Sequence, residues 1–169
     1  MIAPFNALYA AGEHASKIVA PPYDVVTTDE ARARAAGNSK SFLHVSRAEI
    51  DLPAGTEAHS DEVYSRAAQN LSALIDDGAM VKSAYPAYFI YRMHMAGHSQ
   101  TGLACGASLA AYAAGTIHRH ELTRPDKEDD RVKHMAALNA QTGPVLLAYR
   151  PNAALTQVLD DITRRAAAP

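Results

Sequence analysis

The feature that most constrains the fold is a pair of strand-like segments separated by a short turn. The first reads AYFIYRMHM at residues 87–95, and the second reads TGLACGASLA at residues 101–110. Aromatic and β-branched residues favour strands, and the glycine of Ala96-Gly97 suits a tight connection between them. The sequence therefore predicts an antiparallel hairpin, and the other elements must be arranged around it.

Periodic apolar residues predict helices on both sides of this hairpin. From Asp61 to Gly78, apolar side chains recur at spacings of three and four, which is typical of an amphipathic helix. We expect this helix to cover the sheet. Other segments predict helices at 28–37 (with Thr28 as N-cap), 126–139 and 152–165, strands or extended chain at 41–46, 116–122 and 144–149, and a loop at 47–59.

These elements together predict an α+β protein. We expect a mixed or antiparallel sheet that contains the central hairpin and is covered by three or four helices. Residues 1–150 are predicted to form one α+β domain, and residues 151–169 a C-terminal helix with a frayed end.

Charge and cysteine content narrow the classes of partner. The chain of 169 residues has 16 basic and 18 acidic residues, a net charge of −2 and a pI near 6.4. The global positive field that attracts nucleic acids or acidic membranes is therefore missing. No long apolar stretch predicts a membrane helix. The single cysteine, Cys105, excludes an internal disulfide, and we expect a cytoplasmic protein.

One segment concentrates the ionisable side chains. Residues 121–131, ELTRPDKEDDR, hold eight of them and directly follow His118-Arg119-His120. If residues 116–122 are extended, His118 and His120 lie on one side and Arg119 and Glu121 on the other. On the helix that follows, Asp130 can reach His134 one turn later.

Three interpretations of this segment stay open. It predicts either a well-capped, solvated helix start with surface ion pairs, or a phosphoryl-transfer site. In the second case Glu121 and one or more of Asp126, Glu128 and Asp129 hold Mg²⁺, and Arg119, Arg124 and Lys127 bind phosphate oxygens. The third interpretation is a transition-metal site that uses His118, His120 and Glu121 or His134.

Three further positions attract attention. Pro21–Asp24 forms a rigid corner that either packs its tyrosine or places Tyr23 and Asp24 at a pocket edge. His44 is interpreted as a hydrogen-bonded core histidine. Cys105 is interpreted as a small buried side chain.

Several strings resemble the N-terminal part of a known family, the domain of unknown function 1015. They are APPYDVV at 20–26, SFLHV at 41–45, EIDLP at 49–53, SQTGL at 99–103, HELTRPDKEDDR at 120–131 and LNAQTGPVLLAY at 138–149. Members of that family are similar to chromosome-partition ParB proteins. They also resemble the wider ParB and sulfiredoxin superfamily, which includes nucleotide-binding DNA clamps and free-serine kinases.

The resemblance and the charged segment together imply a nucleotide-dependent phosphotransferase acting on a small hydroxyl substrate. ATP or ADP and Mg²⁺ are the implied cofactors. The implied site consists of Glu121, His120 and Asp126 as catalytic residues, Arg119, Arg124, Lys127 and Arg131 as nucleotide-binding residues, and Glu121, Asp126 and Glu128 as metal ligands.

The alternative function is a non-catalytic module that binds DNA or a protein partner. DNA phosphates would require a folded patch of basic residues, such as Arg32, Arg34, Arg47 and Arg66. The negative net charge argues against DNA.

One departure from the family concerns completeness. Typical members are more than twice this length and carry a DGHHRYE-like motif in the second half, whereas the nearest string here is GTIHR at 115–119. If the phosphate cradle lies in a missing C-terminal half, we expect this chain to fold alone, bind nucleotide weakly and turn over no substrate by itself.

Overall fold

The computed structural model describes residues 1–120 and 122–166 and divides them into two compact units. The helical unit comprises residues 8–82 and 122–143, and the hairpin unit comprises residues 1–7, 83–120 and 144–166. The chain crosses between the units repeatedly, so neither is one continuous segment. The predicted division at residue 150 stays a prediction.

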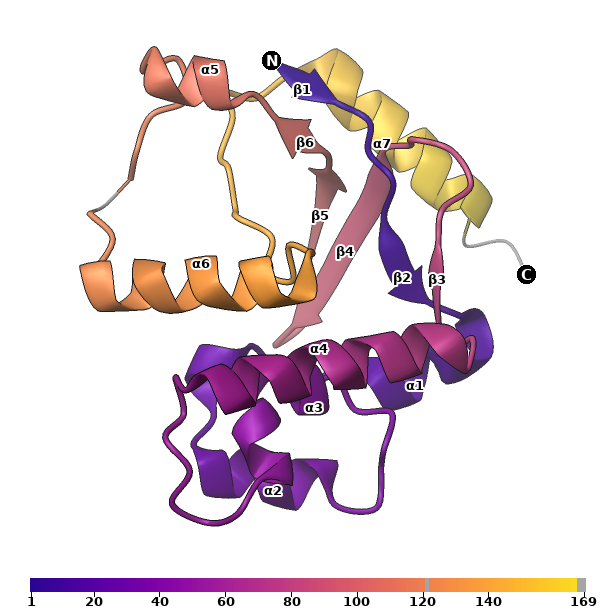
Figure 1. The fold of residues 1–169 in the computed structure, drawn as a ribbon. Helices are drawn as coiled ribbons and strands as arrows, with labels where there is room; N and C mark the ends of the chain where they lie inside the picture. The colour runs from indigo at the N-terminus through magenta and orange to yellow at the C-terminus, as the bar shows by residue number, and fades with distance from the viewer. Residues whose placement is uncertain (121, 167–169) are drawn as a thin grey trace. The chain divides into compact units, whose positions relative to one another are not determined.

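The helical unit is built on α4 (Asp61–Asp76), which crosses the short helices in Figure 1. α6 (Pro125–Leu138), α3 (Leu43–Ser46) and the 3-10 turn η3 (Ala48–Asp51) pack against α4. The helical unit also contains β2 (Leu8–Ala10), η1 (Gly12–His14), α1 (Ala15–Ile18), η2 (Tyr23–Val25), α2 (Thr28–Ala35) and β3 (Met80–Lys82). The strands β2 and β3 form an antiparallel pair.

Local sequence signals fix the ends of the main helices. Thr27 caps α2 in a capping box with Glu30, one residue before the predicted cap. Pro125 occupies the first turn of α6, where its missing N–H costs no hydrogen bond. Asn139 ends α6 in the left-handed region at φ +48°, which asparagine tolerates better than most residues.

Both hydrophobic core clusters lie in the helical unit. The larger contains the buried stripe of α4 together with Val45, Met80 and Leu138, and the smaller contains Leu43 with residues of α2 and η3. The unit therefore has the packed interior that can hold a pocket in fixed geometry.

The hairpin unit contains two antiparallel strand pairs. β4 (Phe89–Met95) pairs with β5 (His98–Ala104), and β1 (Ile2–Ala3) pairs with β6 (Gly106–Ala107). Ala96 and Gly97 both have positive φ, at +49° and +78°, as a type I′ hairpin turn requires. α5 (Leu109–Ala113) follows β6, and α7 (Ala153–Ala166) packs against β5.

The α+β class, the hairpin and the four longer helices are confirmed, but the sheet differs from the prediction. The described strands form three separate two-stranded antiparallel sheets rather than one sheet covered by helices. α4 packs mainly on helices, not on a sheet. His44 bonds to Asp51 and to the carbonyl of Asn38, which confirms a hydrogen-bonded histidine.

Several predicted segments have a different conformation. The strand predicted at 41–46 is wrong, because the helix α3 lies there. Leu43 and Val45 belong to different core clusters. This short helix is therefore buried on two sides, which gives its sequence the alternation of apolar and polar residues that is typical of a strand. The strand predicted at 144–149 is also wrong, because no described strand pairs with it. The second hairpin strand ends at Ala104, η3 interrupts the predicted loop at 47–59, and residues 116–120 and 122 form neither helix nor strand.

Among residues 1–120 and 122–166, no helix has the length and apolar content needed to cross a membrane.

The buried apolar stripe of α4 predicts that substitutions at two of the helix's apolar residues lower the stability by very different amounts. Leu71 is 5% exposed in the larger cluster, whereas Ile75, one turn later, is 42% exposed. Leu71→Ala should lower the free energy of unfolding by about 2–5 kcal/mol through the cavity it leaves, and Ile75→Ala by less than about 1 kcal/mol. Denaturant unfolding followed by circular dichroism measures both, and equal losses would contradict the packing described.

Candidate functional site

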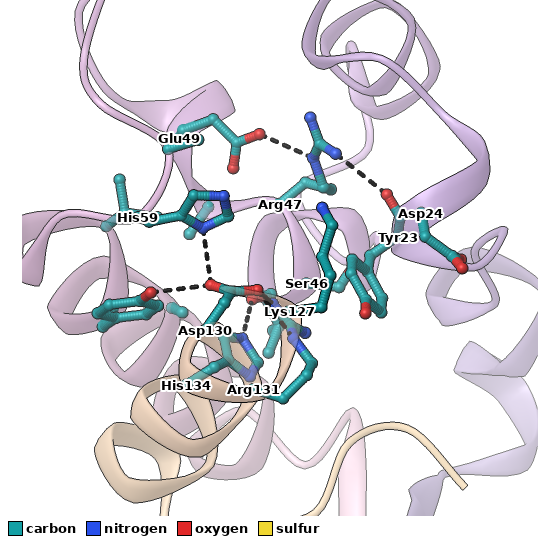
Figure 2. Close-up of a pocket in the computed structure, with 16 residues that line it drawn as sticks. Tyr23, Asp24, Ser46, Arg47, Glu49, His59, Lys127, Asp130, Arg131 and His134 are labelled. Carbon is teal, nitrogen blue, oxygen red and sulfur yellow. Dashed lines mark hydrogen bonds and ion pairs between the residues drawn. The ribbon is translucent and has the colours of Figure 1, made fainter. Parts of the chain in front are cut away.

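A pocket of about 310 Å³ lies in the helical unit, between α6, α4 and the segment from α3 to His59. Its apolar wall comes from core side chains such as Val45 and Val63, and Tyr23 and Asp24 lie at its edge. That edge position agrees with one predicted role of the Pro21–Asp24 corner. Figure 2 shows ionisable side chains from three parts of the chain converging on the pocket.

The carboxylate of Asp130 is the centre of the polar network. Asp130 is only 6% exposed. Its Oδ1 accepts hydrogen bonds from His59 Nδ1 at 2.7 Å and from the Tyr64 hydroxyl at 2.8 Å. Its Oδ2 accepts from Arg131 Nε at 3.0 Å and Nη2 at 2.6 Å. Both oxygens are therefore satisfied, as a buried charge requires.

These contacts fix the protonation states of Asp130 and Tyr64. Burial alone would raise the pKa of Asp130, but the hydrogen bonds from Arg131 and Tyr64 and the charge of Arg131 outweigh burial, so the pKa is lowered. Burial first, and then the hydrogen bond to Asp130, raise the pKa of Tyr64 to about 12. Asp130 consequently stays ionised at neutral pH, and Tyr64 stays a hydrogen-bond donor.

His59 presents a free ring nitrogen to solvent. Because its Nδ1 faces the ionised Asp130, Nδ1 carries the proton of this hydrogen bond, and in the neutral form of the ring the lone pair is on Nε2. The side chain is 55% exposed, and no described residue is recorded as a hydrogen-bond partner of Nε2. A buried carboxylate that orients an accessible imidazole is the arrangement used for general acid–base catalysis.

Three cationic side chains border the same pocket. Arg47 is held by Glu49 at 2.7 Å and by the Tyr23 carbonyl at 3.1 Å, and the Arg131 guanidinium carbon lies 4.0 Å from the centre of the Tyr23 ring. Lys127 extends from α6 toward Arg47 in Figure 2. Its ammonium group makes no recorded ion pair or hydrogen bond with the residues that the structure describes, so it is available to an anion.

His134 lies in the buried part of the pocket. Its Nε2–H donates to the carbonyl of Val45 at 3.1 Å, and the residue is 3% exposed. Burial lowers the pKa of His134, an effect that the hydrogen bond to Val45 opposes and the charge of Arg131 reinforces. The imidazole is therefore neutral at pH 7 and keeps a lone pair on Nδ1.

The structure brings only part of the predicted site to this pocket. Lys127 and Arg131 line it. Arg124 and Asp126 instead form an exposed ion pair with each other, which lowers the pKa of Asp126, and Glu128 accepts from Thr123.

The remaining predicted residues are not part of the pocket lining. His118, Arg119 and His120 belong to the hairpin unit, where Arg119 bonds to the hydroxyl of Tyr112. Glu121 lies outside the described residues. Among those described, no group of three His, Cys, Asp or Glu side chains could hold a metal ion. The catalytic, nucleotide and Mg²⁺ roles assigned from the sequence stay predictions.

Sequence reasoning missed Arg47, His59 and Asp130 as members of one site. His59 is 71 positions from Asp130 and lies in a segment without helical or strand periodicity. Asp130 was expected to reach His134 along the helix, but its recorded hydrogen bonds go to His59, Tyr64 and Arg131. A clue lay in the sequence: Lys127, Arg131 and His134 share one helical face.

Comparison with known proteins identifies a family whose description names no activity. The family model described as "Protein of unknown function (DUF1015)" matches residues 2–169. No curated protein matches the chain, and no solved structure does.

The buried imidazole predicts a pH-dependent stability. Because the pKa of His134 is lowered from 6.5, the unfolded chain binds this proton at a higher pH than the folded chain does. The contribution is therefore present above pH 6.5 and is lost as the pH falls toward the folded pKa. In denaturant unfolding between pH 5 and 7, as an approximate range, His134→Gln should lose less stability on acidification than the wild type.

The exposed His94→Gln in β4 is the matched control, and it should leave the pH dependence unchanged. An undiminished pH dependence in His134→Gln would contradict the prediction.

Proposed function

The chain belongs to the family of proteins of unknown function DUF1015, whose description names no activity. We therefore propose a function from the geometry of the pocket. The proposed function is phosphoryl transfer from a nucleoside phosphate to a small hydroxyl compound. One observation carries it: the Asp130–His59 pair opens onto a pocket that also holds the ammonium group of Lys127.

The cations support binding of a phosphoryl group. Lys127 supplies a positive charge that no described carboxylate neutralises, and Arg47 and Arg131 add guanidinium groups already oriented by Glu49 and Asp130. Phosphate oxygens favour such donors, because charge-assisted hydrogen bonds are stronger than neutral ones. Positive charge also stabilises the oxygens of a phosphoryl group during transfer.

The imidazole supports the proton transfer that this reaction needs. His59 Nε2 takes the proton of the substrate hydroxyl as its oxygen forms a bond to phosphorus. The bond from phosphorus to the leaving oxygen breaks at the same time, and its electron pair leaves with the shortened nucleotide. The negative charge of Asp130 stabilises the imidazolium that forms.

No step of the proposed reaction is assigned to Mg²⁺. The predicted Mg²⁺ ligands among the described residues are Asp126, paired with Arg124, Glu128, bonded to Thr123, and Asp129, and none of them lines the pocket. These contacts do not make a metal centre, so His59 and the three cations carry the proposed chemistry.

The alternative, a DNA-binding module, has less support. The net charge of −2 gives no global positive field for DNA phosphates, and Arg32 is paired with Asp29. A salt-dependent mobility-shift assay separates the two functions, because phosphate neutralisation on DNA gives a steep dependence of affinity on salt.

Ligand binding provides the first test. Inorganic phosphate, ATP, ADP and CTP are titrated into the wild type with and without Mg²⁺, and backbone amide shifts are followed by NMR. We expect shifts at Lys127, Arg131 and His59, and Lys127→Met should weaken binding by about tenfold or more.

Lys133→Met is the matched control, because Lys133 lies on α6 but does not line the pocket. It should bind like the wild type. No shifts at the pocket, or equal weakening by both variants, would overturn the phosphoryl-binding proposal.

The acid–base role is tested through the reactivity of the imidazole. Diethyl pyrocarbonate acylates a free ring nitrogen, and mass spectrometry measures the rate at each histidine. His59 should react faster than the buried His134. Asp130→Asn should slow the reaction at His59 several-fold, because an amide can also donate to Nδ1 and then no longer holds the tautomer whose lone pair is on the accessible Nε2.

Asp126→Asn, on the same helix but outside the pocket, should leave that rate unchanged. Circular dichroism confirms that both variants are folded, and Tyr64→Phe supplies a second, milder change at Asp130. An unchanged rate in both Asp130→Asn and Tyr64→Phe would refute the acid–base role.

A further inference from the structure

We propose that the ligand of this pocket carries, besides its phosphoryl group, a free hydroxyl group that donates a hydrogen bond to Nδ1 of His134. This inference rests on the proposed function and adds the class of phosphoryl acceptor: a short diol or polyol, whose phosphorylated product carries both groups. His134 is then the residue that selects hydroxylated compounds, and it takes no part in the proton transfer at His59.

The first observation is an unused acceptor in the buried part of the pocket. Nδ1 of His134 is buried and has no hydrogen-bond partner among the described residues, although the residue lines the pocket. Since Nε2 carries the proton that bonds to Val45, Nδ1 can only accept. A buried polar atom without a partner costs free energy, and a ligand that supplies a donor recovers it.

The second observation is a neighbouring side chain in the same condition. Ser46 Oγ is also buried and without a recorded partner, and Ser46 also lines the pocket. Ser46 directly follows Val45, the residue to which His134 is bonded. The residues that line the pocket therefore include two with an unpartnered buried atom, an acceptor on His134 and a group that donates or accepts on Ser46.

A hydroxyl group suits the unpartnered atoms of His134 and Ser46 better than an ammonium group or a methyl group does. An ammonium group would also donate to Nδ1, but it would enter a pocket bordered by Arg47, Lys127 and Arg131, where like charges repel. A methyl group would leave both polar atoms unsatisfied. A neutral hydroxyl can donate to His134 and accept from Ser46.

The positions on α6 indicate the size of the compound. Lys127 and His134 are seven residues apart on one helical face, so their Cα atoms are separated by about 10 Å along the axis. The Lys127 side chain extends toward Arg47 in Figure 2. A phosphoryl group near Lys127 and a hydroxyl near His134 therefore belong to a molecule with a short carbon chain.

The test compares ligands that differ only in the terminal group. Dissociation constants are measured by calorimetry for 2-hydroxyethyl, 3-hydroxypropyl and 4-hydroxybutyl phosphate, for the matching ethyl, propyl and butyl phosphates, and for 2-aminoethyl phosphate. We expect one hydroxyalkyl phosphate to bind about tenfold or more tightly than its alkyl analogue.

Two variants and one spectroscopic measurement assign that preference. Ser46→Ala, which removes no recorded hydrogen bond, should reduce the preference, and His134→Phe should abolish it while binding of the alkyl phosphate persists. The ¹⁵N resonance of His134 Nδ1 in the wild type should move to lower frequency with the hydroxyalkyl phosphate, as for a newly accepted hydrogen bond. This measurement keeps the test valid if His134→Phe fails to fold.

The outcomes separate this inference from the proposed function. Equal binding of each pair, or a preference with no movement of the His134 resonance, overturns the hydroxyl assignment and leaves phosphoryl binding intact. Tighter binding of 2-aminoethyl phosphate than of 2-hydroxyethyl phosphate overturns it in favour of an amine. Binding of none of the compounds overturns both proposals.

Discussion

The buried carboxylate of Asp130 is the interaction on which the pocket depends. It joins α6 to one remote part of the chain, because His59 and Tyr64, at the start of α4, lie 71 and 66 positions from Asp130, and Arg131 is its neighbour on α6. A buried charge that loses a partner destabilises a fold by several kcal/mol. The charge of Asp130 therefore requires the helices and the loop to meet in this geometry, and the same geometry orients His59.

A second set of contacts places the cations. Arg47 links η2, α2 and η3 through Tyr23, Thr28 and Glu49, and Arg131 stacks on the Tyr23 ring. Guanidinium groups held in this way lose little further freedom when they bind an anion. Lys127 differs because its ammonium group has no recorded partner among the described residues. The site thus combines preorganised arginines with one uncommitted positive charge.

Local patterns in the sequence identified much of the secondary structure. The hairpin, α4 and α6 follow from periodicity, Ala96-Gly97 and Pro125. Residues 41–46 were misread because Leu43 and Val45 are buried on opposite sides of one helical turn. Residues 144–149 were misread because a strand also needs a paired neighbour, which its own composition cannot guarantee.

The sequence by itself determined the α+β class, the hairpin with its turn at Ala96-Gly97, and the helical face of α6 that Lys127, Arg131 and His134 share. Only the tertiary structure decided that Asp130 bonds to His59 across 71 positions rather than to His134 one turn away. The physical reason is that helical spacing fixes only local neighbours. Long-range partners of a carboxylate are fixed by which core surfaces pack together and by the need to satisfy a buried charge.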